Sequence, residues 1–313
     1  MIKYTIIIPH FNSPDSLSRL LSTIPKTPEV QVIVIDDNST ADREKLDSVI
    51  SGDNRCEFYV NSTGIQSAGA CRNTGLSYMK GEWVLFADAD DYFTDNFYEY
   101  LENYYNDPSD VIYFTPKSIN ISTMKESSRH VLYAGIVKKY LKKPSDKNEI
   151  NLRYRFGVVW SKMIRREIII QNNIEFETVS ASNDIMFSTR LGQCIKTFQA
   201  SEKVIYCVTK STDTLTTTIK EVNLDTRIDV LIRRYEFYRK NLTEKELRQL
   251  EVTGELMLFE AFMGFGIKKF FDVIKLLKKN KVKLFAVSLF NLHMSTVVFM
   301  DRIGLYIKRR QQR

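Results

Sequence analysis

Three carboxylates lie within four positions of the segment FADADDYF, at Asp88, Asp90 and Asp91. If this segment continues a strand, the side chains of Asp88 and Asp90 point the same way, with Cα atoms roughly 6.6 Å apart. Two anions this close repel, and a raised pKa, solvent or a divalent cation with hard oxygen ligands relieves the repulsion. The cluster therefore indicates either a metal and diphosphate site or a solvated turn whose aspartates cap the next helix.

The elements that must position these carboxylates alternate along the first ninety residues. β-branched runs predict strands, and amphipathic runs between them predict helices. This alternation predicts a doubly wound, mostly parallel α/β sheet with flanking helices. The predicted strands are 5–10, 30–36, 56–60 and 83–88, and the predicted helices are 13–24, 41–50 and 67–79.

Polar side chains follow the predicted strands. Asn12 follows the first, Asp36 and Asp37 close the second, and the acidic cluster follows the fourth. Ligands of such sheets bind beyond the carboxyl ends of the strands, so we expect these residues to converge in one site. The loop after the first strand, PHFNSPDS, contains no glycine, and no GxxxxGK[ST] is present, which argues against dinucleotide enzymes and P-loop hydrolases.

Four segments of the chain, IIIPHFN, VIVIDDNST, STGIQSAGACRNTGLSYMKGEWVLFADADD and SNDIMFSTRLG, resemble the motifs of family 2 glycosyltransferases in order and approximate spacing. Members of that family are inverting nucleotide-sugar enzymes with the GT-A fold. The resemblance covers about the first 215 residues. It implies the roles described in the next three paragraphs.

The resemblance implies a nucleoside pocket at the ends of the first two strands. Pro9, Phe11 and Asn12 would line the pocket of the base, and Asp36 or Asp37 would accept a hydrogen bond from a uracil-like NH. Taken alone, the segment DDNST equally predicts an Asx-type turn with a helix cap.

The resemblance also implies a diphosphate site. Arg72 would contact the nucleotide or its phosphates, Asp88 would bind the ribose or the metal, and Asp90 would be the principal ligand of Mn²⁺ or Mg²⁺. The alternative is that Arg72 is an ordinary arginine on a helix surface that binds no ligand.

Asp184 would be the general base that takes the proton of the acceptor hydroxyl. The chain has Asn183 before it, where the family more often has glutamate. Further sugar or acceptor contacts would come from Asp91, Trp160, Lys162, Asn183 and Lys210. The alternative for Asp184 is an aspartate that only stabilises the first turn of a helix, and the alternative for Trp160 is a tryptophan buried in the core.

Residues 221–313 differ from the predicted catalytic domain, residues 1–220, because the strand pattern stops and helical periodicity follows. From Gly264 onward the chain has twelve Lys and Arg against two acids, although the whole chain is only +7. Leu284–Met300 is short for a membrane span, so we expect a basic helix lying on an anionic membrane surface. The alternative is a helical bundle packed on the catalytic domain.

These observations predict an inverting, metal-dependent glycosyltransferase that uses a UDP-linked sugar and a glycan or polyprenyl-linked acceptor of envelope polysaccharide synthesis. No signal-peptide core or disulfide framework is evident, so a cytoplasmic protein at the membrane face is expected. No nucleic-acid partner is predicted, and a homo-oligomer is left open. The alternative is an inactive, glycosyltransferase-like scaffold, because Asn183 and the absence of arginines from IYCVTKSTDTLT depart from the family pattern.

Overall fold

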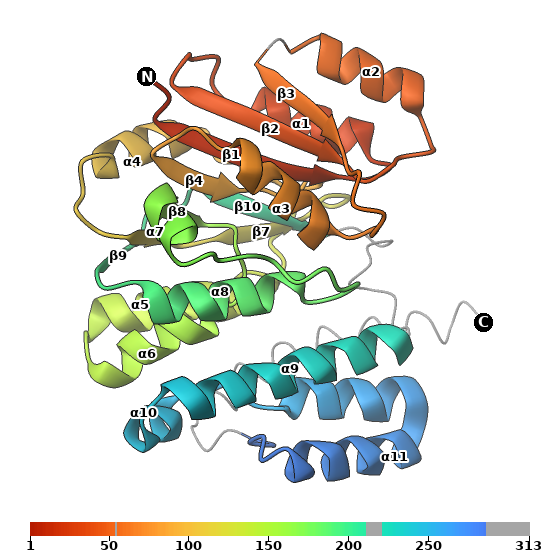
Figure 1. The fold of residues 1–313 in the computed structure, drawn as a ribbon, viewed down its shortest axis with the longest axis vertical. Coiled ribbons are helices and arrows are strands. Elements are labelled where there is room, and N and C mark those ends of the chain that lie inside the picture. The colour runs from red at the N-terminus through yellow and green to blue at the C-terminus, as the bar shows by residue number, and fades with distance from the viewer. Residues whose placement is uncertain (54, 211–220, 286–313) are drawn as a thin grey trace.

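The computed structural model describes residues 1–53, 55–210 and 221–285 of the chain. Its main sheet has seven strands in the order β3-β2-β1-β4-β8-β6-β9, and within it only β8 runs antiparallel to its neighbours. Helices cover both faces of this sheet, and a further helical layer lies below it (Figure 1). The predicted doubly wound α/β fold is confirmed.

The first half of the sheet forms from strictly alternating elements. The predicted strands 30–36 and 56–60 match β2 and β3 residue for residue. The bounds are β1 Tyr4–His10, α1 Pro14–Ser22, β2 Val30–Asp36, α2 Arg43–Ser51, β3 Cys56–Val60, α3 Ala68–Tyr78 and β4 Trp83–Phe86.

The predicted strand 83–88 ends earlier than expected, at Phe86. The backbone N–H of Asp91 donates to the carbonyl of Asp88 at 3.0 Å, so the acidic cluster is a turn and not an extended strand end. The aspartates do not cap the next helix either, because β5 intervenes and Asn96 occupies the N-cap position of α4. The extended strand end and the capping role are therefore corrected, whereas the turn of the alternative interpretation is confirmed.

The second half of the α/β fold inserts a small sheet and several helices. A three-stranded sheet, in the order β5-β10-β7, packs beside the acidic turn. The bounds are β5 Tyr92–Phe93, α4 Phe97–Tyr104, β6 Val111–Phe114, β7 Lys117–Asn120, α5 Val131–Lys142, α6 Asp146–Arg155, β8 Lys162–Arg165, α7 Arg166–Gln171, α8 Asn183–Cys194, β9 Phe198–Ser201 and β10 Tyr206–Lys210.

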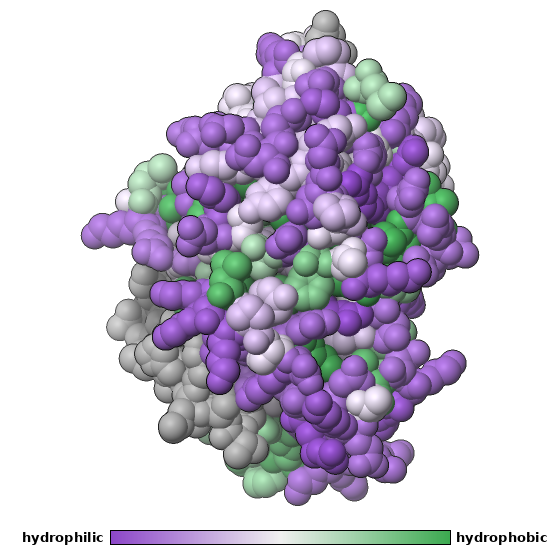
Figure 2. Space-filling view, turned by 90° about the vertical axis from the view of Figure 1, so that its left-hand side faces the viewer, coloured by the Kyte–Doolittle hydropathy of each residue, from purple (hydrophilic) through white to green (hydrophobic). Residues whose placement is uncertain are grey.

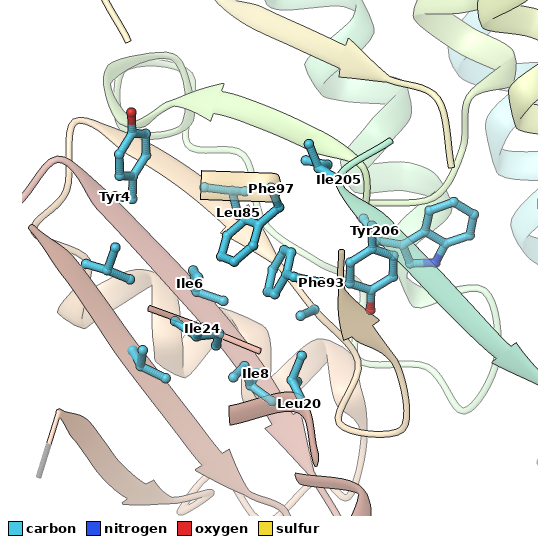
Figure 3. Close-up of a cluster of buried hydrophobic side chains, with 14 of the residues drawn as sticks. Tyr4, Ile6, Ile8, Leu20, Ile24, Leu85, Phe93, Phe97, Ile205 and Tyr206 are labelled. Atoms are coloured by element: carbon cyan, nitrogen blue, oxygen red, sulfur yellow. The ribbon is translucent and has the colours of Figure 1, made fainter. Parts of the chain in front are cut away.

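Hydrophobic clusters on the two faces of the main sheet hold these layers together. One cluster, part of which is drawn in Figure 3, joins β1, α1, β4 and α4 to Ile205 and Tyr206. The ring of Tyr206 meets that of Phe93 edge to face at 5.4 Å, which brings β10 against β5 although 113 positions separate the two residues. The acidic turn therefore lies between elements that the core fixes on both sides.

The C-terminal helices pack on the α/β fold; their bounds are α9 Glu221–Asn241, α10 Glu244–Gln249 and α11 Glu255–Lys279. They share a hydrophobic cluster with Ile150 and Tyr154 of α6. This arrangement agrees with the bundle alternative for the helices that are described. The boundary at residue 220 stays a prediction, since it adjoins the undescribed residues 211–220.

No helix in the described ranges is long and apolar enough to cross a membrane. Most of the predicted interfacial segment Leu284–Met300 lies outside the described residues. The face that Figure 2 shows is mainly hydrophilic, with apolar side chains scattered between hydrophilic ones.

Candidate active site

The ends of β1 and β2 are joined by a buried polar network. Asp36 is fully buried and accepts hydrogen bonds from His10 Nδ1 at 2.9 Å, from the Ser39 hydroxyl at 2.5 Å and backbone N–H at 3.0 Å, and from Arg43 Nη1 at 3.1 Å. Burial opposes ionisation of Asp36, but the hydrogen bonds from Ser39 and His10 outweigh it and lower the pKa. Asp36 thus stabilises the strand ends with both oxygens and has little capacity left for a ligand.

Asn12 links the loops that follow β1 and β2. Its backbone N–H donates to the Ser39 hydroxyl at 2.8 Å, and its side-chain Oδ1 accepts from the N–H groups of Thr40 and Ala41 at 2.9 and 3.0 Å. Asn12 adopts φ 48°, a left-handed conformation that asparagine tolerates better than most residues. The predicted pocket residue is therefore part of the loop scaffold.

The three other residues predicted for the base pocket differ in their exposure to solvent. Phe11 is 45% exposed, and Pro9 is half-buried at its pairing position opposite Ile35. Asp37 is 5% exposed and accepts from Asn61 Nδ2 at 2.6 Å through one oxygen. The Cys71 thiol is a second partner of Asp37, so Asp37 has fewer donors than Asp36 and is the better candidate of the two to accept from an imide N–H.

The three aspartates of the turn have different surroundings. Asp91 is 1% exposed and accepts from the Tyr206 hydroxyl at 2.9 Å and from the Thr209 N–H at 2.7 Å. Burial, with further repulsion from Asp90 and Asp88, raises the pKa of Asp91. Asp91 fastens the turn to β10 and is enclosed by protein, so its predicted sugar contact gains no support from this geometry.

Asp88 and Asp90 remain accessible. The Asp88 side chain is 33% exposed, and its backbone N–H donates to the Tyr206 hydroxyl at 2.8 Å. The Asp90 carboxylate is half-buried and, within the described part of the chain, accepts no hydrogen bond from another residue. Burial and the charge of Asp88 raise the pKa of Asp90, whereas Arg129 and Arg19 oppose that shift.

Arg72 of α3 connects the acidic turn to the start of α8. Its Nη2 donates to Asp88 Oδ1 at 2.5 Å and its Nη1 donates to Asn183 Oδ1 at 2.7 Å. The guanidinium group also lies 5.3 Å from the centre of the Phe176 ring, which limits its freedom. Asn183 is therefore a partner that orients Arg72 without neutralising its charge.

Asp184 lies in the first turn of α8, next to this bridge. It is half-buried, and among the described residues no other residue donates a hydrogen bond to its carboxylate. Burial raises the pKa of Asp184, with Asp88 adding to the shift and Arg72 and Lys162 opposing it. A carboxylate with a raised pKa and no fixed partner is chemically suited to accept a proton.

Trp160 and Lys162, predicted to contact a sugar or acceptor, lie in the interior. Trp160 is 6% exposed and stacks on Tyr206 at 5.9 Å, as the core alternative expects. Lys162 is 1% exposed, and its Nζ donates to the carbonyl of Phe156 at 2.8 Å and to the Ser188 hydroxyl at 3.1 Å. Direct contact between either residue and a ligand therefore stays a prediction that this geometry does not favour.

Two arginines at the site were not foreseen. Arg19 Nη2 of α1 donates to the Asp90 carbonyl at 2.5 Å, and Arg129 Nη1 donates to the Thr209 carbonyl at 2.7 Å. Neither arginine belongs to a recognisable motif. Arg19 lies in the helix between β1 and β2, and Arg129 follows β7. Lys210, the remaining predicted contact, ends β10 beside the undescribed residues 211–220.

The carboxylate oxygens of Asp88 and Asp90 are candidate ligands for a divalent metal ion. Within the described ranges, no three His, Cys, Asp or Glu side chains are grouped so as to hold a metal ion. Mg²⁺ and Mn²⁺ sites on phosphate substrates need only one or two protein carboxylates, however. Asp88 offers one oxygen that Arg72 leaves free, and Asp90 offers a carboxylate whose pKa is raised by burial and by the charge of Asp88. These two residues therefore fit a metal that is completed by a ligand's phosphates.

Two solved structures share this fold with the chain. Staphylococcus aureus TarS, residues 1–349 in complex with UDP-GlcNAc, aligns with a TM-score of 0.62 over 98% of this chain and 81% of that one, at 20% identity. The mannosyltransferase PcManGT from Pyrobaculum calidifontis, in complex with GDP-Man and Mn²⁺, aligns with a TM-score of 0.57 over 98% and 86% of the two chains, at 14% identity. At such identities the likeness establishes the GT-A fold alone.

Sequence comparisons extend the resemblance. The poly(ribitol-phosphate) beta-N-acetylglucosaminyltransferase TarP of Staphylococcus aureus is 29% identical over 194 residues, covering 60% of this chain and 57% of the relative. The poly(ribitol-phosphate) beta-glucosyltransferase of Bacillus spizizenii is 29% identical over 206 residues, covering 60% of this chain and 29% of the relative. The chain thus matches at most about half of the length of these relatives. The model of glycosyl transferase family 2 matches residues 5–172, more than half of the chain, and the chain belongs to that family.

Proposed function

We propose that the protein transfers a sugar, with inversion, from a UDP-linked donor to a hydroxyl group of a glycan or lipid-linked acceptor in envelope polysaccharide synthesis. The observation that carries the proposal is the Arg72 bridge, with contacts of 2.5 Å to Asp88 and 2.7 Å to Asn183. Through it, the acidic turn and the helix that bears Asp184 form one charged cluster. A general base and a diphosphate site must be neighbours for glycosyl transfer, and this cluster supplies both.

Asp184 takes the proton of the acceptor hydroxyl in the proposed reaction. The hydroxyl oxygen then forms a bond to the anomeric carbon, while the bond from that carbon to the diphosphate oxygen breaks on the opposite face. The nucleoside diphosphate leaves with the bonding electron pair, and the anomeric configuration inverts. Burial raises the pKa of Asp184, whereas the positive charges of Arg72 and Lys162 oppose that rise and favour the ionised form of the base.

Charge stabilisation at the leaving group is the second requirement. Arg72 lies beside Asp88 and retains hydrogen-bonding capacity toward a phosphate, because Asn183 is neutral. Asp88 and Asp90 would hold Mn²⁺ or Mg²⁺, which when bound neutralises charge on the departing diphosphate. Asp37 would accept from the imide N–H of uracil, and the exposed ring of Phe11 would cover the base.

The acceptor class is inferred from relatives. Several are named as poly(ribitol-phosphate) glycosyltransferases, and a Campylobacter jejuni enzyme, 31% identical over 94 residues, is named for an undecaprenol-linked acceptor. These are polymers or lipids of the cell envelope. We therefore expect the protein to work at the cytoplasmic face of the membrane.

Calorimetric titration of UDP, GDP and dTDP, with and without Mn²⁺, tests the donor site. We expect UDP-selective, Mn²⁺-dependent binding that Asp90→Ala abolishes. Asp95→Ala, an exposed aspartate five positions along, is the matched control and should bind as the unaltered protein does. If no nucleoside diphosphate binds under any condition, the enzyme interpretation gives way to the inactive scaffold.

A further inference from the structure

Helix α11 is a hairpin of two antiparallel halves. Its backbone breaks at Gly266, with φ 84° and ψ −174°, and Figure 1 shows the chain reversing direction there. The far ends meet: the Gly254 N–H donates to the Lys283 carbonyl at 2.8 Å, and a Cβ on Gly254 would lie 2.5 Å from Leu277 Cδ1. The turn of the hairpin is thus the segment 262–271, referred to here as the hairpin tip.

The hairpin tip exposes large apolar side chains. Phe262 is 48% exposed, Ile267 is 56% exposed and Phe271 is 59% exposed. Phe270 is half-buried between them, with its ring 5.9 Å from that of Phe262 and 5.5 Å from that of Phe271. Because neighbouring rings support one another, the tip presents a preformed apolar surface and not isolated side chains.

Basic residues share this surface. Ile267, Phe271, Lys275 and Lys278 are spaced four, four and three residues apart, which places them on one helix face. All four are exposed, whereas Val273, on the opposite face, is 2% exposed and packs in the core.

Most lysines near the hairpin tip are free to meet an external charge. Lys269 is the exception, since it pairs with Glu221 and Asp225 of α9 at 2.9 and 2.7 Å. Within the described residues, no carboxylate pairs with Lys268 or Lys275, nor with Lys278 and Lys279 farther along the helix. Asp272 is the one acid of this half of the helix, so the surface stays strongly basic.

We propose that the hairpin tip docks the protein onto a membrane surface rich in anionic headgroups. Exposed Phe and Ile side chains insert at the boundary between headgroups and acyl chains, and adjacent lysines approach the phosphates. Unpaired positive charge beside aromatic side chains complements an anionic membrane surface. It does not complement a neutral or basic partner.

The placement of the hairpin tip suits a membrane-bound acceptor. In Figure 1 the turn of α11 lies on the same side of the molecule as the carboxyl ends of β1 and β2 and the start of α8. Docking there holds the candidate active site toward the membrane. This last step rests on the proposed function, whereas the docking itself does not.

Vesicle sedimentation of the full chain tests the proposal. We expect binding to phosphatidylcholine vesicles that contain phosphatidylglycerol, no binding to pure phosphatidylcholine, and weaker binding as salt is added. Lys268→Gln with Lys275→Gln should weaken binding about thirtyfold, at about fivefold per lysine. Ile267→Ser with Phe271→Ser should weaken it at least as much. Two lone substitutions of exposed residues elsewhere, Lys142→Gln and Ile170→Ser, are the controls and should leave it unchanged.

Failure of the full chain to bind anionic vesicles would overturn the proposal. So would equal binding by the tip variants, which would assign the interaction to another part of the chain. If the tip substitutions instead convert a dimer to a monomer in analytical ultracentrifugation and leave vesicle binding intact, the surface docks a second copy. UDP titration of the same variants separates the proposals, because a tip that fails to dock still leaves the donor site intact.

Discussion

Replacing Lys162 with methionine tests the electrostatics beneath the candidate base. Burial lowers the pKa of Lys162 from 10.5 to about 7; Asp184 opposes this shift and Arg234 adds to it. Between these pH values, the unfolded chain holds a proton that the folded chain lacks, so the free energy of unfolding rises with pH. The pKa of Lys162 differs by about 3.5 between the unfolded and folded chain, which corresponds to at most about 5 kcal/mol in the free energy of unfolding.

The sign follows from this linkage. As pH falls from 10.5 toward 7, the unaltered protein loses the stability associated with Lys162, and below about 7 that loss is complete. Lys162→Met has no such titration. The free energy of unfolding of the variant minus that of the unaltered protein should therefore grow by about 1.4 kcal/mol for each pH unit lowered within this window.

Urea unfolding at several pH values between 7 and 9.5 measures this slope. The lost hydrogen bonds to Phe156 and Ser188 destabilise the variant by an amount that does not depend on pH, about 1–3 kcal/mol, so the slope and not the offset is diagnostic. Lys142→Met, at an exposed position, should give no slope. A difference that is flat across the window for Lys162→Met would refute the reasoning.

Four further outcomes are expected. Asp184→Asn should lower kcat by about 10²–10⁴ and leave UDP affinity within about twofold, as measured by UDP release and calorimetry; retained turnover would exclude the base assignment. Because burial raises the pKa of Asp184, the rising limb of the kcat profile should lie above pH 3.8, and Lys162→Met should move it higher; a lower limb would contradict this. Arg72→Met should weaken UDP binding about tenfold or more, since a charge-assisted phosphate contact is lost, and unchanged affinity would place the phosphates elsewhere. Tyr206→Phe should cost about 1–3 kcal/mol in urea unfolding, because buried Asp91 loses a donor, and a negligible change would show that water replaces it.

Local sequence patterns determined the alternation of strands and helices. β-branched runs such as VQVIVID favour one conformation over their whole length, so β2 was predicted residue for residue. The expected convergence of Asn12, Asp36 and the acidic turn rests on the rule that ligands bind beyond the carboxyl ends of parallel strands, and the parallel pairing of β1 with β2 and β4 places these ends at one edge. The choice between Asp36 and Asp37 as the ligand could not be predicted, because the donors to Asp36 include His10, 26 positions away.

Tertiary structure decided which polar groups remain available. Asp91 and Asp90 are adjacent in the sequence, yet Asp91 is enclosed by donors more than a hundred positions away, while Asp90 is left without a side-chain partner among the described residues. Lys162, predicted to contact a sugar or an acceptor, donates to Ser188 of α8, so its environment is set by residues on other elements.

The sequence by itself therefore determined the first four strands of the main sheet, the acidic cluster and the family to which the chain belongs. Only the tertiary structure decided that Arg72 bridges Asp88 and Asn183, that Arg19 donates to the acidic turn, and that α11 folds back to expose its apolar tip. The physical reason is range. Backbone preferences act over a few residues and are written in local patterns, whereas burial and charge depend on partners that the chain brings together only when it folds.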